Sequence, residues 1–394
     1  MGDGGTASVD YVIYGSTPWD GPWLTEQNLA NALAPSHRVL YVEPPRSPLS
    51  PFRYGVSWDA ARKLARLIHP RMRATDGLKV LTPLTLPPAE HPRARAASLP
   101  LLHAQLAHAT RSLKFSRPVV IAARAVLDLQ GAVGERALVY LVKDLNEAGE
   151  AMLGKDPELI ATQVAAMCAR ADLVVAVTKT LQETLTSRGF EAQVLRHGFH
   201  ADLAPLYDRA PLPPEYATMP APRIGYAGHI DARLDFDALT DVADRFPDGS
   251  LILVGPVSPR LPQGALEPLR RRQNVHMLGP RDRLSLPGYL RHLSCCLMPY
   301  RENEWLRHGS PLKLWDYLYA GPPLVGSGCT ALRNYRLVAF ADSAASLPEL
   351  VSEVLHSDAG SRAERQAFAM ANTWDHRATE LDKLVTTALG ESSH

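Results

Sequence analysis

Residues 308–325 read HGSPLKLWDYLYAGPPLV, and they combine a helix and a strand in one short stretch. Ser310 can cap the N-terminus of a helix, and Pro311 suits the first helical position, where an N–H would have no partner. Gly321 and the proline after it end the helix, and the apolar run 323–325 begins a buried strand. A helix that leads directly into a buried strand predicts one repeat of an alternating α/β fold.

Apolar runs of strand length recur on both sides of this stretch and alternate with helical periodicity. In the second half the predicted strands are 224–228, 250–254, 275–279, 295–298 and 323–325, with a helix over 236–245. In the first half they are 11–14, 38–43, 118–122, 137–142 and 171–177, with helices over 25–34 and 157–170. This alternation predicts the α/β class, with two doubly wound, Rossmann-like domains that face each other across a cleft.

Six prolines between residues 205 and 222 separate the two halves. Such a density of proline disfavours a helix or a central strand, so we predict a stiff linker. The first domain is then 1–205, with the linker running to residue 222, and the second domain is 223–373. Ligands of such sheets bind outside the carboxyl ends of the strands, which directs Gly15 and Gly228 toward the cleft.

The composition argues against several classes of protein. Lys and Arg number 42 against 41 Asp and Glu, so a net charge of +1 offers no field that would recruit nucleic acid or an anionic membrane. The 4 Cys lack the spacing of a metal site or a disulfide framework, which favours a reducing, cytoplasmic compartment. We expect neither a secretory signal nor a membrane span. Only eight of the basic residues are Lys, a bias typical of a GC-rich actinobacterial genome.

The start of the predicted helix after Ser310 has the chemistry of a diphosphate site. Free backbone N–H groups and the positive end of the helix dipole attract anions there, and Lys313 adds a full positive charge. Asp316 lies three residues further on, roughly 4.5 Å up the helix axis, where a carboxylate can accept hydrogen bonds from two ribose hydroxyls. The structural alternative is a capped surface helix with a local Lys–Asp pair.

Three motifs of the second half resemble the nucleotide-binding half of the retaining GT-B glycosyltransferases, in particular the branch with teichuronic-acid and exopolysaccharide enzymes. They are GHIDARLD at 228–235, NVHMLG at 274–279 and SPLKLWDYLYAG at 310–321. In the first half, residues 140–144 resemble an element that borders the acceptor, and RHGFH at 196–200 resembles the end of the last strand of the N-terminal domain.

The resemblance implies an enzyme that moves a hexose-like sugar from a nucleoside-diphosphate-sugar to a small polar acceptor with retention of configuration. No metal or other cofactor is expected. Segment 374–394, with apolar residues at helical spacing, would form a helix that crosses back to the first domain. Catalysis would involve Asp144, His197, Arg233 and Lys313. The donor-binding residues would be Gly15, Gly228, His229, Arg233, Met277, Leu278, Gly279, His308, Ser310, Pro311, Leu312, Lys313 and Asp316.

Departures from the family pattern concern the sugar and the phosphates. Asp316 stands where the family has Glu, and His308, eight positions earlier, stands where many members have a Glu that contacts the donor sugar. The usual Gly-Arg…Lys arrangement on the phosphates is absent, which leaves His229 and Arg233. We therefore expect Arg233 and Lys313 to share the diphosphate.

Several of these residues also have ordinary structural interpretations. Asp144, at the end of a predicted strand, is equally a helix cap, and His197 is more typical of a histidine that lines a cleft than of an acid–base catalyst. Arg233 is also placed to pair with Asp231 at the surface. The aromatic loop 19–23 suits either stacking on a sugar or packing.

Two other functions stay open. A cell-envelope or exopolysaccharide enzyme at the membrane surface would carry an amphipathic basic helix, for which segment 60–73 is the best candidate. A non-catalytic two-domain protein would bind a nucleotide-sugar without turnover. We expect instead an enzyme that acts on a small polar acceptor, in actinobacterial natural-product biosynthesis.

Overall fold

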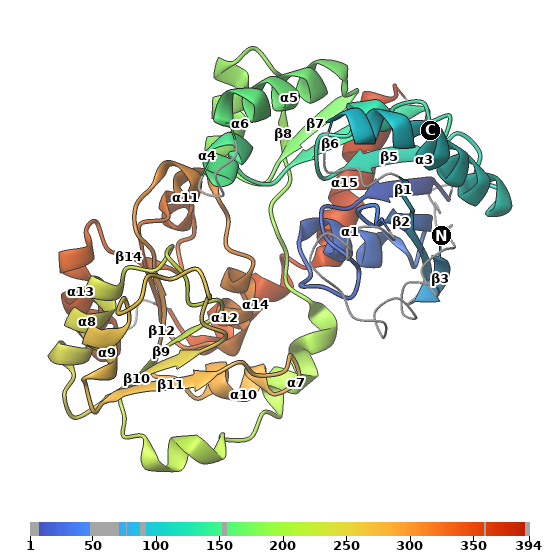
Figure 1. Cartoon of the computed structure of the whole chain (residues 1–394). Helices are drawn as coiled ribbons and strands as arrows, with labels where there is room; N and C mark the ends of the chain where they lie inside the picture. Colours follow the sequence, from blue (N-terminus) through green and yellow to red (C-terminus); the bar gives the residue numbers. More distant parts are fainter. Residues whose placement is uncertain are drawn as a thin grey trace, which may run out of the picture. The chain divides into compact units, whose positions relative to one another are not determined.

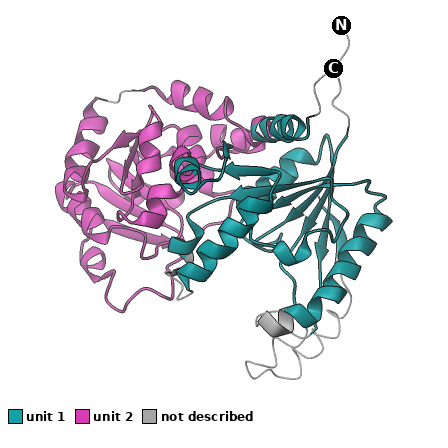
Figure 2. Cartoon of the chain, turned by 90° about the horizontal axis from the view of Figure 1, so that it is seen from above, with its two compact units in different colours: residues 1–177, 182–195, 377–394 teal, residues 178–181, 196–376 magenta. Residues whose placement is uncertain are grey.

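The computed structural model of the chain describes residues 8–47, 71–75, 77–86, 92–151, 156–357 and 360–390. The chain divides into two compact units (Figure 2). Unit 1 comprises residues 1–177, 182–195 and 377–394, and unit 2 comprises residues 178–181 and 196–376. Most of the basic segment 60–73 lies outside the described residues.

Unit 1 is built on an eight-stranded sheet in the order β3-β4-β2-β1-β5-β6-β7-β8 (Figure 1). Neighbouring strands are parallel except for the antiparallel edge pair β3–β4. Strands β1, β5 and β6 are buried along their whole length, as expected for strands covered by helices on both faces. The strands are β1 (Asp10–Tyr14), β2 (Arg38–Val42), β3 (Arg71–Thr75), β4 (Leu78–Thr82), β5 (Val119–Ala122), β6 (Ala137–Val142), β7 (Leu173–Ala176) and β8 (Gln193–Val194).

The helices of unit 1 begin where the local sequence favours a start. The Asp156 carboxylate accepts hydrogen bonds from the N–H groups of Glu158 and Leu159, and Pro157 fills the first position of α5. None of the helices in the described residues is both long enough and apolar enough to cross a membrane. The helices are α1 (Thr25–Leu33), α3 (Pro92–Ser112), α4 (Asn146–Ala151), α5 (Pro157–Arg170), most of α6 (Lys179–Ser187) and most of α15 (Trp374–Ala388).

Unit 2 is built on a six-stranded, fully parallel sheet in the order β11-β10-β9-β12-β13-β14. The five strands predicted in this half are all present, and their ends differ from the predicted ones by at most two residues. The strands are β9 (Arg223–Ala227), β10 (Ser250–Val254), β11 (Val275–Gly279), β12 (Cys295–Pro299), β13 (Leu324–Ser327) and β14 (Ala339–Phe340).

Two groups of helices cover the sheet of unit 2, with α8, α9 and α13 in one group and α10, α12 and α14 in the other (Figure 1). Asp235 caps α8 through a hydrogen bond from the Ala238 N–H, and the apolar face of that helix is buried. The helices are α8 (Phe236–Arg245), α9 (Glu267–Arg270), α10 (Leu286–Arg291), α11 (Glu304–His308), α12 (Lys313–Ala320), α13 (Leu347–His356) and α14 (Arg362–Met370).

The proline-rich segment 205–222 is not a linker, and this prediction was wrong. The segment belongs to unit 2 and contains most of the short helix α7 (Ala204–Asp208) and the 3-10 helix η4 (Pro214–Thr218). Two of its six prolines, Pro205 and Pro214, lie in the first turns of these helices, where a missing N–H costs nothing. Tyr207 and Tyr216 anchor the segment because both rings are fully buried in the core of unit 2.

The boundary between the units falls between Leu195 and Arg196 rather than at residue 205. At the C-terminal end, the chain is grouped with unit 1 from residue 377, after the first turn of α15. The Tyr11 hydroxyl of β1 donates a 2.6 Å hydrogen bond to the Asp382 carboxylate of α15. This bond ties the C-terminal helix to a central strand of unit 1.

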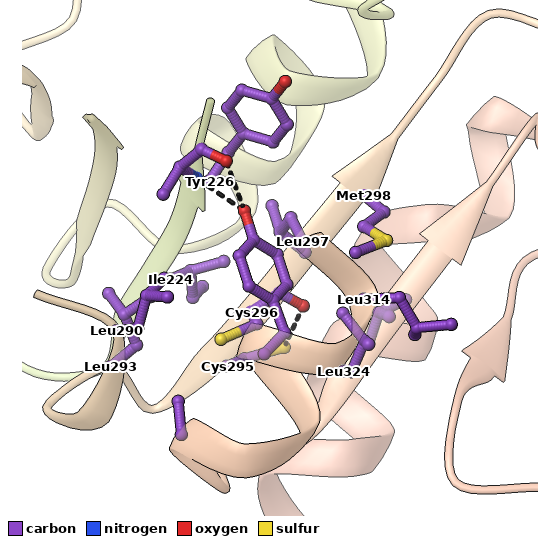
Figure 3. Packing of buried hydrophobic residues seen from close by; sticks show 14 of the residues in the cluster. Ile224, Tyr226, Leu290, Leu293, Cys295, Cys296, Leu297, Met298, Leu314 and Leu324 are labelled. Atoms are coloured by element: carbon purple, nitrogen blue, oxygen red, sulfur yellow. Dashed lines mark hydrogen bonds between the residues drawn. The ribbon is translucent and has the colours of Figure 1, made fainter. Parts of the chain in front are cut away.

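The buried Tyr317 side chain of helix α12 is hydrogen-bonded to the end of β9. The Tyr317 hydroxyl accepts a 2.6 Å hydrogen bond from the Ala227 N–H and donates a 2.9 Å bond to the Ala227 carbonyl. Around this contact Cys296, Leu297 and Leu314 pack together without exposure to solvent (Figure 3). Strand and helix are thereby held in one fixed register.

Removing this hydroxyl should destabilise unit 2 because it leaves the Ala227 peptide groups buried and unsatisfied. We expect Tyr317→Phe to cost about 1–3 kcal/mol, seen as a lower urea midpoint of the transition that includes unit 2. The control is Tyr319→Phe, which removes only a longer, 3.3 Å hydrogen bond to Asp208. Equal losses in the two variants would contradict the special role of the Tyr317–Ala227 contact.

Candidate functional site

The strand order of unit 2 identifies where a ligand is expected. Strand β9 lies between β10 and β12, so the chain moves outward from it in two directions and creates a topological switch point. Ligands of open α/β sheets bind outside the carboxyl ends of the strands at such a point. The loops after β9 and β12 meet there, where the Arg301 N–H donates a 2.8 Å hydrogen bond to the Arg233 carbonyl.

Gly228, the first residue after β9, has the backbone conformation and the surroundings that only glycine tolerates. Its φ is +146°, in the region that L side chains rarely adopt. A Cβ at this position would collide with the amine of Lys313. The absence of a side chain therefore lets a cation of α12 approach the turn directly.

The Lys313 amine is enclosed by aromatic side chains. Its Nζ donates a 2.6 Å hydrogen bond to the Tyr226 hydroxyl and lies 4.0 Å from the centroid of that ring. The Tyr300 ring is 6.0 Å away on another side. Burial, helped by the positive charge of Arg233, lowers the pKa of Lys313 to about 7. The neutral form of the amine is therefore much more favoured than in an ordinary lysine.

Arg233 pairs with Asp231 in the structure, which is the structural alternative that the sequence left open. Its Nε and one terminal nitrogen form a forked contact with both carboxylate oxygens, at 2.9, 3.1 and 2.6 Å. The guanidinium also lies 5.6 Å from the centroid of the Trp305 ring. Although burial opposes ionisation, Arg233 holds the pKa of the Asp231 carboxyl below its usual range. About a third of the Arg233 side chain (34%) remains exposed for a ligand.

Helix α12 begins later than the sequence predicts, and Ser310 does not cap it. The helix begins at Lys313, and its first turn is closed by hydrogen bonds to the carbonyls of Pro311 and Leu312. The Ser310 hydroxyl is buried and has no hydrogen-bond partner among the described residues. The end of the helix is as predicted, with Gly321 at φ +94°. The sequence pattern located the helix but misjudged which residue would start it.

Asp316 lies one turn into α12 and is partly buried. The Tyr207 hydroxyl donates a 3.0 Å hydrogen bond to its Oδ1. Burial raises the pKa of Asp316 to about 6, because the charged carboxylate loses solvation. No hydrogen bond joins it to Lys313 in the described residues, so the local Lys–Asp pair of the alternative interpretation does not form.

A pocket of about 310 Å³ opens beside the carboxyl ends of β9, β10 and β11. Two of the predicted base-binding residues, Met277 and Gly279, line it, whereas Leu278 does not. The carbonyl of Leu278 instead accepts a hydrogen bond from Arg281 at 2.5 Å. The pocket is lined by Ile230, Gly255, Val257, Arg270, Val275, Met277 and Gly279. Its lining combines apolar side chains with polar groups such as Arg270, and its size is suited to a flat organic group.

The three candidate histidines of unit 2 have different surroundings. His229 exposes its side chain, and its carbonyl accepts a 2.9 Å hydrogen bond from the Tyr226 hydroxyl. His308 is buried in the last turn of α11, where its Nδ1 is 2.8 Å from the carbonyl of Glu304. His197 is also buried and packs against Trp374, with the ring centroids 5.8 Å apart. Of the three, only His229 exposes its side chain to solvent.

Gly15 and Asp144 belong to unit 1, whereas the other candidates belong to unit 2. Gly15 directly follows β1, where a side chain would collide with Tyr41, and its carbonyl accepts a 3.1 Å hydrogen bond from Arg124. Asp144 follows β6 and is partly buried. Both lie at the carboxyl ends of central strands, as the sequence predicts.

The same edge of unit 1 holds a buried ion pair that the sequence did not reveal. The Lys143 amine donates 2.8 Å hydrogen bonds to the Glu26 carboxylate and to the Ser16 hydroxyl. Glu26 is fully buried and also accepts hydrogen bonds from the N–H and hydroxyl of Ser16. Despite its burial, these contacts hold the pKa of Glu26 below its usual range. The network fixes the loop after β1 to the loop after β6.

The tyrosines around Lys313 and Asp316 are the site residues that sequence reasoning missed. Tyr226 and Tyr300 surround the amine, and Tyr207 orients the carboxylate. Tyr226 had a detectable signal, because it immediately precedes the Ala-Gly turn of the 228–235 motif. Tyr207 had none, since the residues around it were interpreted as a linker. In the part of the chain that the structure describes, no group of three acidic, His or Cys residues could hold a metal ion.

Burying the Lys313 amine should make the site a source of instability. Unfolding restores the ordinary pKa of the amine, so the unfolded chain binds more protons than the folded chain between pH 7 and 10.5. The free-energy cost of burying the charged amine is therefore complete below pH 7 and decreases as the pH rises above 7. We expect Lys313→Met to stabilise the protein by about 0.5–2 kcal/mol at pH 7 and by less at pH 9. Thermal unfolding at the two pH values measures this, and a destabilised variant at pH 7 would contradict it.

Comparison with known proteins gives one partial sequence match. No family model matches the chain. TuaH of Bacillus subtilis (strain 168), assigned as a glycosyltransferase of teichuronic acid biosynthesis, is 33% identical over 104 residues. The match covers 26% of this chain and 26% of TuaH, about a quarter of each protein.

Solved structures match over nearly the whole chain, at low sequence identity. A UDP-forming α,α-trehalose-phosphate synthase from Burkholderia xenovorans has a TM-score of 0.64 at 15% identity and covers 97% of this chain and 99% of its own. Anabaena Alr3699/HepE, in complex with UDP and glucose, has a TM-score of 0.64 at 14% identity, with 96% and 100% covered. An E. coli trehalose-6-phosphate protein bound with UDP-2-fluoro glucose has a TM-score of 0.65 at 14% identity, with 95% and 98% covered. These likenesses confirm the predicted fold class, in which two Rossmann-like α/β units form a GT-B fold.

Proposed function

We propose that the chain is a glycosyltransferase that moves a hexose-like sugar from a nucleoside-diphosphate-sugar to a small polar acceptor, with retention of configuration. The observation that carries the proposal is the Lys313 amine, which stands at the start of α12 and at the switch point of unit 2. A cation at a helix N-terminus suits a diphosphate leaving group. The GT-B fold and the partial likeness to TuaH support the same class of enzyme.

The donor would lie along the carboxyl ends of β9, β10 and β11. Its base would enter the 310 Å³ pocket beside Met277 and Gly279, and its diphosphate would meet Lys313 and Arg233. The ribose hydroxyls would donate to Asp316, whose Oδ2 is the oxygen that Tyr207 leaves to a ligand. Base, ribose and diphosphate then each have a distinct partner in unit 2.

The transfer itself would depend on electrostatic stabilisation. The acceptor hydroxyl forms a bond to the anomeric carbon on the face from which the diphosphate departs, and its proton passes to the departing phosphate oxygen. Lys313 and Arg233 would stabilise the charge that develops on this leaving group. Asp144 is the more accessible candidate to assist the acceptor, because His197 is only 3% exposed.

We infer that the reaction needs neither a metal nor another cofactor, because two cationic side chains supply the positive charge at the diphosphate. The proposed setting is the cytoplasm, with a soluble acceptor such as an intermediate of natural-product biosynthesis. The partial likeness to TuaH favours a second candidate, an enzyme that extends a cell-envelope polysaccharide. A transfer assay distinguishes the two candidates. Transfer to a soluble acceptor supports the first, and transfer to a lipid-linked glycan supports the second.

Thermal-shift measurements with UDP-, GDP- and dTDP-sugars test the proposal. At least one donor should raise Tm, since a ligand at 100 times its Kd adds about 2.7 kcal/mol of stability.

Lys313→Ala should weaken the binding of that donor by about 1.5–3 kcal/mol, because it removes a charge-assisted hydrogen bond. Transfer of the sugar should persist in EDTA. If no donor shifts Tm, the donor site is refuted, and a loss of activity in EDTA that Mg²⁺ restores would refute the metal-free reaction.

The assigned role of Asp316 predicts a specific dependence on the ribose. Asp316→Asn should lower the affinity for the nucleotide-sugar. The amide nitrogen of Asn can only donate hydrogen bonds, so it cannot accept one from a ribose hydroxyl. A 2′-deoxyribose donor should bind the wild type more weakly than the ribose donor, but the two should bind the variant about equally. Equal affinities of both donors for the wild type, measured by calorimetry, would show that Asp316 does not contact the ribose.

A further inference from the structure

The hydrogen bonding of the Lys313 amine is incomplete in a way that points to an anionic ligand. A protonated amine can donate three hydrogen bonds. Among the described residues, the Lys313 amine has one acceptor, the hydroxyl of Tyr226 at 2.6 Å. Beside the amine, the Arg233 guanidinium and the start of α12 also favour negative charge.

Tyr226 holds this amine through a short relay. Its hydroxyl donates a 2.9 Å hydrogen bond to the carbonyl of His229, so its hydrogen is committed and a lone pair is left for Lys313. The ring lies beneath the amine at 4.0 Å, and the bare Gly228 turn closes another side. The direction of the amine is therefore set by Tyr226 rather than by an acidic partner.

Burial of the amine and the positive charge of Arg233 oppose its protonation, whereas the carboxylates of Asp231 and Asp316 favour it. The Asp231 carboxylate is engaged by Arg233 in a forked contact, which weakens its attraction for the amine. Asp316 lies on the same helix but bonds to Tyr207. The ionisable groups that face Lys313 from β9, the loops after β9 and β12, and α12 are Tyr226, Asp231, Arg233, Tyr300 and Asp316.

We propose that Tyr226 is the residue that positions Lys313, and that the donor diphosphate binds together with one proton, which is taken from solvent onto the Lys313 nitrogen. The inference rests on the proposed function and deepens it. The amine lone pair forms the new N–H bond, the buffer acid loses its proton, and no bond of the donor changes. When the nucleoside diphosphate leaves, the amine returns the proton to solvent.

The sign of the pH dependence follows from this scheme. Burial lowers the pKa of the free amine to about 7, and a bound anion raises it, so the complex holds more protons than the free protein above pH 7. Donor affinity should therefore fall as the pH rises above 7. A nucleotide-sugar is the right probe because both of its phosphates are esterified and keep their charge across this range.

Calorimetry in two buffers with different ionisation enthalpies measures the proton directly. For wild-type protein and a nucleotide-sugar, we expect uptake of roughly half a proton at pH 7 and nearly one at pH 8. Lys313→Met should abolish this uptake. Binding without proton uptake at both pH values overturns the inference but leaves the proposed function intact. Absence of donor binding at any pH overturns the proposed function, and the inference with it.

Tyr226→Phe tests the positioning role, because it keeps the ring and removes only the acceptor. Without that acceptor the amine protonates less readily, so donor affinity should fall about tenfold at pH 8 and recover toward that of the wild type at pH 6. The control is Tyr216→Phe, which removes another buried hydroxyl of unit 2, bonded at 2.9 Å to the carbonyl of Tyr289. A loss for Tyr226→Phe that is the same at both pH values would indicate a merely structural role and overturn the assignment.

Discussion

Two neighbouring contacts between β9 and α12 determine the site of unit 2. Tyr317 bonds both peptide groups of Ala227, and the next residue, Gly228, receives the amine of Lys313. Residues 313 and 317 are four apart on one helix and so share a face. Fixing the tyrosine therefore fixes the lysine over Tyr226, and the helix cannot slide without breaking both contacts.

This register buries the ionisable side chains of Lys313 and Asp316. Their burial opposes folding, but it leaves them able to interact strongly with a ligand. Burial lowers the pKa of Lys313 to about 7 and raises that of Asp316 to about 6. Both shifts mean that the folded chain disfavours the charged side chain before a ligand arrives. A bound diphosphate and ribose would supply the missing partners. The free energy of binding would then offset the cost of burying the two charged side chains. Shifted pKa values of this kind are typical of functional sites.

The corresponding edge of the sheet in unit 1 is arranged differently. There Lys143 and the fully buried Glu26 satisfy each other, and both bond to the Ser16 hydroxyl between them. A buried ion pair contributes little net stability, but removing one partner is costly because it leaves a lone charge. The pair therefore keeps the loop after β1 in one conformation, whereas the amine in unit 2 is left open to a ligand.

By itself, the sequence determined the α/β class, most central strands, the end of α12 at Gly321, and the candidates Gly228, Lys313 and Asp316, because apolar periodicity and glycine turns are local signals. Tertiary structure alone decided the rest. The proline-rich segment 205–222 belongs to unit 2, where Pro205 and Pro214 lie in the first turns of short helices and two buried tyrosines hold the segment in the core. Likewise, the tyrosines that contact Lys313 and Asp316 come from distant segments of the chain, and only packing brings such segments together.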